Sequence, residues 1–222
     1  MIYDTLKTRR FVRKYDNTVD IPESLIDSLL RKTWEVTPSK NNFMAYNVHV
    51  IGQGLENQKY KEATYLNCLG NEAHGDGINI NDIIPQRYST YLPNYSNILS
   101  CSYLLIFTMR LETEPSPMIQ WSVNRGHNFE ALDESKLDHL VPLSAFEIGL
   151  FADAFGGMCL ENDLDVSVIG CFSKDLTTWK DLPFITRKPI MTMTVGKAHT
   201  YLPQPRPNDL RPNYEKIVNF VK

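Results

Sequence analysis

The most apolar stretch of the chain, residues 143–172, predicts one long helix that turns and runs into a short strand. Small residues recur along it at intervals of four, three and four, at Ala145, Gly149, Ala152 and Gly156. This spacing forms one stripe on the helix. Because Gly inside a helix costs roughly 1 kcal/mol relative to Ala, we expect another backbone to pack close to the stripe. That backbone would belong to the same chain or to a second copy. An ordinary buried core helix is the alternative.

The end of this helix is predicted from two polar residues. Asn162 or Asp163 is expected to adopt the left-handed conformation that ends helices, which these residue types tolerate better than others. Residues 165–172 then alternate as a strand. Gly170 in that strand marks a position where a ligand could approach the backbone.

Periodicity elsewhere predicts two further helices and three further strands. Residues 19–34 form an amphipathic pattern, with Pro22 in the first turn and Glu23 beside it. A single domain over 1–222 is expected, with 71–82 as a surface loop, 111–139 as a lid or insertion and 198–222 as a Pro-rich C-terminal arm. The other expected elements are a strand at 46–51, a helix at 57–68, a fully buried strand at 103–109 and a strand at 189–195 that Gly196 closes.

Composition narrows the classes of partner. The chain has 222 residues, of which 42% are hydrophobic and 22% charged, and its net charge is -3. These values are typical of a globular protein and give no reason to expect nucleic acid or an anionic membrane as partner. No apolar run is expected to span a bilayer, and the first residues lack the apolar core of a signal peptide.

Cysteine and histidine usage predicts neither a disulfide framework nor a metal site. The chain has four cysteines and five histidines, and none makes a metal-ligand spacing with another. The surroundings of Cys159 and Cys171 are apolar. We therefore expect reduced, mostly buried thiols in a cytoplasmic protein.

A basic cluster near the N-terminus is the first candidate for binding. Arg9, Arg10, Arg13 and Lys14 lie within six residues, interleaved with apolar side chains. Guanidinium groups held against the protein body could bind a phosphate bidentately. A solvated basic turn is the alternative.

A second candidate is the polar turn at 38–42, between a core helix and a core strand, which suits ligand binding but also suits a plain turn. The sequence contains no GxGxxG, GK[ST], GxSxG or HExxH motif, and no Ser, Cys or His is set as an activated nucleophile. An anion site without evident catalytic groups favours chemistry supplied by a cofactor.

Five segments in this order resemble the nitroreductase-like family of FMN-dependent oxidoreductases. They are TRRFVRKYD, TPSKNNFMAY, AFEIGLFADAF with VSVIGCF, PIMTMTVGK and the terminal RPNYEKIV. The resemblance implies an α+β fold with a central mixed, mostly antiparallel β-sheet flanked by helices. It also implies an intertwined homodimer, with tightly but non-covalently bound FMN at the interface and in contact with both chains.

The resemblance implies a phosphate site near the N-terminus. The RRSxR pattern of the family matches Arg9, Arg10, Phe11 and Arg13, which would bind the FMN phosphate and ribityl chain. Phe11 stands where the family usually has Ser, which removes one hydroxyl contact. Arg211 matches the basic residue that closes on the phosphate, and Arg206 is a rival for that role.

The resemblance also implies contacts to the flavin ring. The APSxxNxQPW pattern matches residues 37–46 and keeps Pro38, Ser39 and Asn42, with Lys40 between them. Met44 replaces Gln and Ala45 replaces Pro in that pattern.

Further ring contacts are implied by two later segments. Asn94 falls where the family places an Asn on the flavin pyrimidine, and Asn97 falls where some members have Lys. Val168, Ile169 and Gly170 match the strand whose backbone amide faces flavin N5.

The implied activity is a reductase with no catalytic side chain of its own. NAD(P)H would reduce FMN and leave, and a nitroaromatic, quinone or enone would take its place in a ping-pong cycle. One alternative is a flavin-consuming or dehalogenating enzyme on the same scaffold. Another is a non-catalytic flavin- or nucleotide-binding protein.

Overall fold

The computed structural model describes residues 12–39, 44–74, 97–110, 124–126, 140–170, 172–173, 175–201 and 217–218. A four-stranded sheet and a two-stranded sheet form its framework. The elements are β1 (Val12–Tyr15), α2 (Glu23–Val36), β2 (Tyr46–Ile51), α3 (Leu55–His74), β3 (Tyr103–Met109), α7 (Leu140–Glu161), β4 (Asp165–Ile169), the 3-10 helix η3 (Leu176–Trp179), β5 (Pro189–Gly196) and β6 (Ala198–Tyr201).

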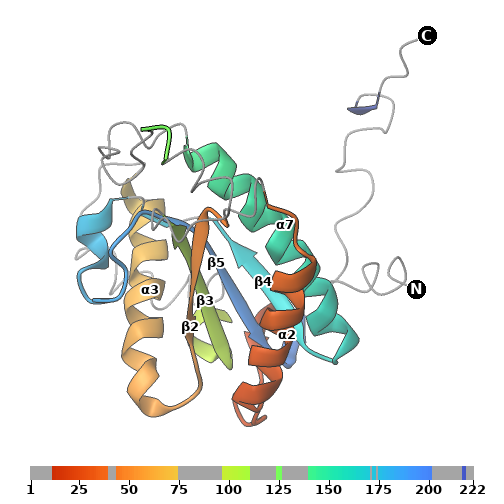
Figure 1. Cartoon of the computed structure of the whole chain (residues 1–222). Coiled ribbons are helices and arrows are strands. Elements are labelled where there is room, and N and C mark those ends of the chain that lie inside the picture. The colour runs from red at the N-terminus through yellow and green to blue at the C-terminus, as the bar shows by residue number, and fades with distance from the viewer. Residues whose placement is uncertain are drawn as a thin grey trace.

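The larger sheet has the strand order β2-β3-β5-β4, and the smaller sheet pairs β1 with β6. Each of these pairs is antiparallel. Helices α2 and α7 cover one face of the larger sheet, and α3 covers the other (Figure 1). Every residue of the central strand β3 is buried, because helices cover both of its faces. The expected α+β fold with a mostly antiparallel sheet flanked by helices is confirmed.

The core beneath α2 and α7 is rich in aromatic rings. Phe151 of α7 packs edge-on against Tyr46 and Phe107, with ring centroids 5.6 Å and 5.8 Å apart. Phe155 stacks on Phe151 one helical turn further along, with centroids 6.1 Å apart. These contacts fix α7 against β2 and β3.

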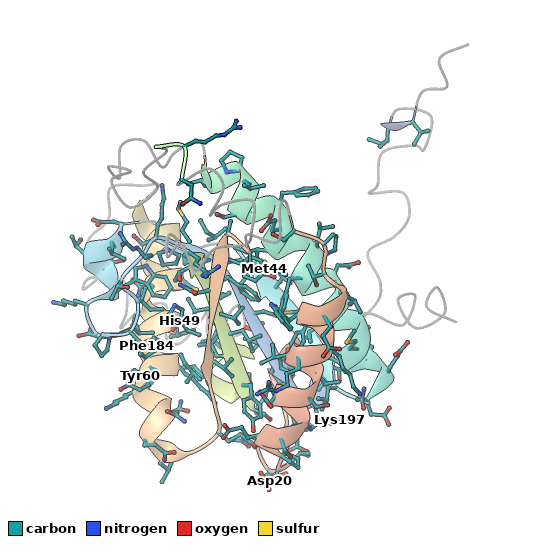
Figure 2. The ribbon with its side chains drawn as sticks, viewed as in Figure 1. Asp20, Met44, His49, Tyr60, Phe184 and Lys197 are labelled. Carbon is teal, nitrogen blue, oxygen red and sulfur yellow. The ribbon has the colours of Figure 1, made fainter. Side chains whose placement is uncertain are left out.

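The opposite face of the sheet carries β1, α3 and η3. Val12 and Tyr15 of β1 are buried in this core together with Ile169 of β4. At its border, the Phe184 ring lies 5.7 Å from His49 and 5.2 Å from Tyr60, so strand β2, helix α3 and the segment after η3 are joined (Figure 2).

The stripe of small residues on α7 does not lie against a single surface of this chain. Ala152 and Gly156 are buried, and a Cβ on Gly156 would lie 3.3 Å from Val166. Ala145 and Gly149 are exposed, and a Cβ on Gly149 would meet no atom within 4 Å. The half of the stripe near the end of α7 therefore packs on the sheet, and the other half is open.

Helix α7 also corrects the expectation about membrane spans. By length and composition alone, Val141–Glu161 could cross a membrane, and half of its most apolar window is buried. The core helix of a globular protein can pass the same test, and α7 contributes Ile148, Phe151 and Phe155 to the core. Its apolar length serves contact with the sheet.

Several predicted elements are confirmed and others are wrong at their ends. The strands at 46–51 and 103–109 have the expected bounds, and Asp163 ends α7 with φ 57°. Helix α2 begins at Glu23 because Pro22 has an extended backbone, with ψ 134°. Helix α3 continues to His74, so the loop expected from residue 71 was wrong at 71–74. Strands β1 and β6 and helix η3 were not predicted.

The expected lid at 111–139 lies outside the described residues, apart from 124–126.

The described thiols are buried, as expected. Cys68, Cys101 and Cys159 are buried, and none of them forms a disulfide within the described part of the chain. Burial raises the pKa of the Cys101 thiol to about 12, although the nearby Lys61 lowers it, and burial also raises the pKa of Cys159. The thiols of Cys101 and Cys159 therefore stay protonated and unreactive at neutral pH.

Candidate cofactor site

The first part of the site lies where the chain enters β2. The Ser39 hydroxyl accepts a hydrogen bond from the Met44 amide, 2.8 Å away, and donates to the Glu147 carboxylate at 2.9 Å. The Ala45 amide donates to the other oxygen of Glu147, also at 2.9 Å. A side chain of α7 therefore holds both Ser39, within the polar turn, and Ala45, just before β2.

Met44 has an unusual backbone at this point. Its φ is 49°, in the left-handed region that non-Gly residues seldom adopt. Its carbonyl accepts from the Arg110 guanidinium at 3.5 Å, and its sulfur accepts from the Tyr46 hydroxyl at 3.7 Å. Burial raises the pKa of the Tyr46 hydroxyl, and the Glu147 charge raises it further, so this donor keeps its proton. Met44 lies near the end of the sheet where β2 begins (Figure 2).

The second part lies where β1 meets β4. The Val12 amide donates to the Ser167 hydroxyl at 3.0 Å, and that hydroxyl lies 3.3 Å from the Val12 carbonyl, to which it donates. The backbone of Arg13, the next residue, therefore runs beside β4, which ends at Ile169 and is followed by Gly170. Gly170 is exposed, and a Cβ there would meet no atom within 4 Å. Its backbone is open to a ligand.

A buried polar group lies on the same face, in the helical turn at 97–100. Ser100 in this turn accepts from the Tyr15 amide at 3.0 Å, which joins the turn to β1. Within the described part of the chain, neither amide atom of the buried Asn97 has a hydrogen-bond partner, and neither does the Ser102 hydroxyl. The buried Lys61 ammonium donates to the carbonyls of Cys101 and Ser102. Unpartnered buried polar atoms are rare and fit a site that gains its partners from a ligand.

The two parts lie at opposite edges of the larger sheet. Residues 39–45 precede the edge strand β2, whereas Gly170 follows the other edge strand, β4. Three inter-strand spacings separate these edges, about 14 Å. Met44 packs on the core beneath α7, whereas Val12 and Ile169 belong to the core on the opposite face. One chain therefore presents the two parts separately.

The structure locates only some of the site residues expected from sequence. Pro38 is exposed, Ser39 and Met44 lie together, and Val168 to Gly170 form the end of β4 and the residue after it. For Arg13 only the backbone is described. Outside the described residues lie Arg9, Arg10, Phe11, Lys40, Asn42, Asn94, Arg206 and Arg211.

Sequence reasoning missed three residues that organise this region. They are Ser144, Glu147 and Ser167, whose hydroxyl and carboxylate groups hold the backbones of Val12 and Ala45. One signal could have pointed to Glu147. It is a charged residue on a mostly apolar helix, and a buried carboxylate needs hydrogen-bond donors.

The architecture is that of the nitroreductase-like fold, which the chain shares over its whole length with solved structures. A nitroreductase-like protein from Streptococcus mutans is 18% identical, with 99% of this chain and 97% of that chain covered and a TM-score of 0.66. A protein from Exiguobacterium sibiricum 255-15, solved in complex with FMN, is 16% identical, with 100% and 97% covered and a TM-score of 0.68.

A third similar structure is an enone reductase of gut-bacterial fatty acid saturation metabolism. It is 16% identical, with 100% of this chain and 98% of that chain covered and a TM-score of 0.61. No protein-family model and no curated protein sequence matches the chain. The similarity thus lies in the fold, at low sequence identity.

Proposed function

We propose that the protein is an FMN-dependent NAD(P)H oxidoreductase of the cytoplasm that reduces a nitroaromatic, a quinone or an enone. Bound FMN would take up hydride at flavin N5 and pass it to the second substrate in a ping-pong cycle. The observation that carries the proposal is the junction of β1 with β4 through Ser167. This junction lays the Val12 backbone, next to Arg13 in the chain, beside Ser167 in the strand that leads to Gly170.

The described residues fit a flavin chemically. The pyrimidine edge of a flavin presents a donor flanked by acceptors, and the buried Asn97 amide offers both a donor and an acceptor without a partner among the described residues. The open backbone of Gly170 would donate to the flavin near N5. Arg9, Arg13 and Arg211 would neutralise the phosphate.

Residues 38–44 are proposed to contact the flavin bound mainly by a second copy of the chain. The separation of the two site parts by about 14 Å supports this arrangement. A homodimer is also supported by exposed apolar side chains on α2 and α7. Trp34 is 59% exposed, Val36 62% and Phe146 65%, and Gly149 nearby on α7 leaves room for a close backbone.

The test of the function is the visible absorption spectrum of the purified protein, before and after adding NADPH or NADH under nitrogen. We expect the bands of oxidised flavin, which bleach when either reductant is added. Subsequent addition of a nitroaromatic, a quinone or an enone should restore them and rank the acceptors.

Two results would contradict the proposal in different ways. A colourless protein that also fails to take up added FMN would exclude the cofactor. Flavin that binds but never bleaches would favour a non-catalytic flavin-binding protein.

Gly149→Leu is expected to prevent dimer formation without unfolding the chain. The new Cβ would meet no atom of its own chain within 4 Å, and it lies on the exposed half of the small-residue stripe. Sedimentation velocity should show a monomer, while circular dichroism retains the helical signal. Glu62→Leu, on the exposed surface of α3, is the matched control and should stay dimeric. A Gly149→Leu protein that assembles normally would refute the assignment of this face.

A further inference from the structure

Glu147 is a charged group buried inside the most apolar helix of the chain. Glu147 lies in the first half of α7 and is only 1% exposed. One carboxylate oxygen accepts a hydrogen bond from the Ser39 hydroxyl and the other accepts one from the Ala45 amide, both at 2.9 Å. Burying a carboxylate is unfavourable unless donors satisfy it, and these bonds help to satisfy it.

A second side chain of α7 acts on the same backbone. The Ser144 hydroxyl donates to the Ala45 carbonyl at 2.8 Å. Ser144 and Glu147 are three residues apart and therefore share one helix face. Together they hold the amide and the carbonyl of Ala45, which is fully buried.

Glu147 also holds Ser39, at the other end of the 39–45 segment. Because Ser39 accepts from the Met44 amide and donates to Glu147, Ser39 and Met44 are bonded to each other and attached to α7. Met44 keeps its left-handed φ of 49° inside this closed arrangement. Strained residues of this kind persist where their surroundings over-determine them, often at functional sites.

One of these bonds depends on a residue particular to this chain. Ala45 stands where the resembling family pattern has Pro, and Pro has no amide hydrogen. The donor to the second oxygen of Glu147 therefore exists only because of this substitution.

We propose that Glu147 is a positioning residue for the cofactor, which fixes the described residues of the 39–45 segment, Ser39, Met44 and Ala45, before the flavin binds. The inference rests on the proposed function, since it assumes that this segment contacts FMN. When the segment is already ordered, the free energy of FMN binding does not have to include the cost of ordering it. Ser144 supports the same segment through the Ala45 carbonyl.

The experiment compares Glu147→Gln and Ser144→Ala with the wild type, and uses Phe155→Leu as the matched control. Phe155 is fully buried on the same helix but packs against Phe151, away from the segment. Two quantities are measured in each protein: hydrogen exchange of the Met44 and Ala45 amides without FMN, and FMN affinity from flavin fluorescence quenching.

For Glu147→Gln we expect faster exchange at both amides and FMN binding weakened about tenfold, since one bond to a charged acceptor is lost. Ser144→Ala should change both quantities in the same direction, by less, and it tests the inference even where Glu147→Gln fails to fold. Phe155→Leu should lower the melting temperature while leaving both quantities unchanged.

The failure of this inference can be told apart from failure of the function. Wild-type protein that binds no FMN would overturn the proposed function and this inference with it. If the wild-type protein binds FMN, and Glu147→Gln and Ser144→Ala bind FMN with the same affinity as the wild type, only the inference would be overturned. Faster exchange without a loss of affinity would likewise show that the segment is held but does not serve the cofactor.

Discussion

Gly196→Ala should lower the free energy of unfolding by about 2–3 kcal/mol, as overpacking a filled core does. An added Cβ would lie 2.7 Å from Cδ1 of Tyr15 and 3.3 Å from the Ser102 backbone nitrogen. The Tyr15 ring cannot swing away, because its hydroxyl is held at 3.0 Å from both the carbonyl and the hydroxyl of Thr194. The midpoint of urea unfolding of the apo protein measures the loss.

Gly52→Ala is the control for this measurement. A Cβ there would lie 3.5 Å from Tyr103, an ordinary contact, so the midpoint should change little. Equal midpoints for the two variants would mean that the contact between Tyr15 and Gly196 yields easily, and that β1 is not fixed against the end of β5.

Arg9→Ala should weaken FMN binding about 100-fold, because a bidentate pair with the phosphate supplies two charge-assisted hydrogen bonds. Arg9 lies outside the described residues, and its role is proposed from the sequence pattern before β1. Isothermal titration with FMN measures the affinity, and the melting temperature of the apo protein should stay unchanged.

Arg31→Ala provides the comparison for Arg9→Ala. Arg31 is an exposed arginine on α2 that pairs with Asp27 at 2.7 Å, so its loss should leave FMN affinity unaltered. Near-normal affinity in Arg9→Ala would show that the phosphate binds elsewhere.

Local patterns predicted the parts of the fold that depend on local chemistry. The strand at 46–51 follows from its alternating pattern, and the strand at 103–109 follows from its continuous apolar run. The helix end at Asp163 follows from the tolerance of Asp for positive φ. Such features depend on a few neighbouring residues, so a single sequence contains them.

Strand β1 could not be predicted in this way. Its sequence, VRKY, is half basic and has no clear alternation. It becomes a strand because β6 pairs with it and because Ser167, 155 residues away, binds the Val12 backbone. Pairing between distant segments leaves no local periodicity to find.

The residues of the candidate site likewise fall into two groups, those that the sequence pattern predicted and those that depend on distant contacts. Ser39, Met44 and Gly170 were expected because their segments match the family patterns position by position, with Met44 in place of Gln. Glu147 was not expected, because the donor that explains its burial is the backbone amide of Ala45, 102 residues away. A backbone amide is present at nearly every position, so the sequence does not reveal which one a carboxylate meets.

The separation of the site parts across the larger sheet has a thermodynamic consequence. In a dimer whose subunits complete each other's site, subunit association and FMN binding are linked equilibria, and each strengthens the other. Diluting the protein below its dimer dissociation constant would release flavin, while saturating FMN would keep the subunits together. Cofactor occupancy would then depend on how much of the protein a cell contains.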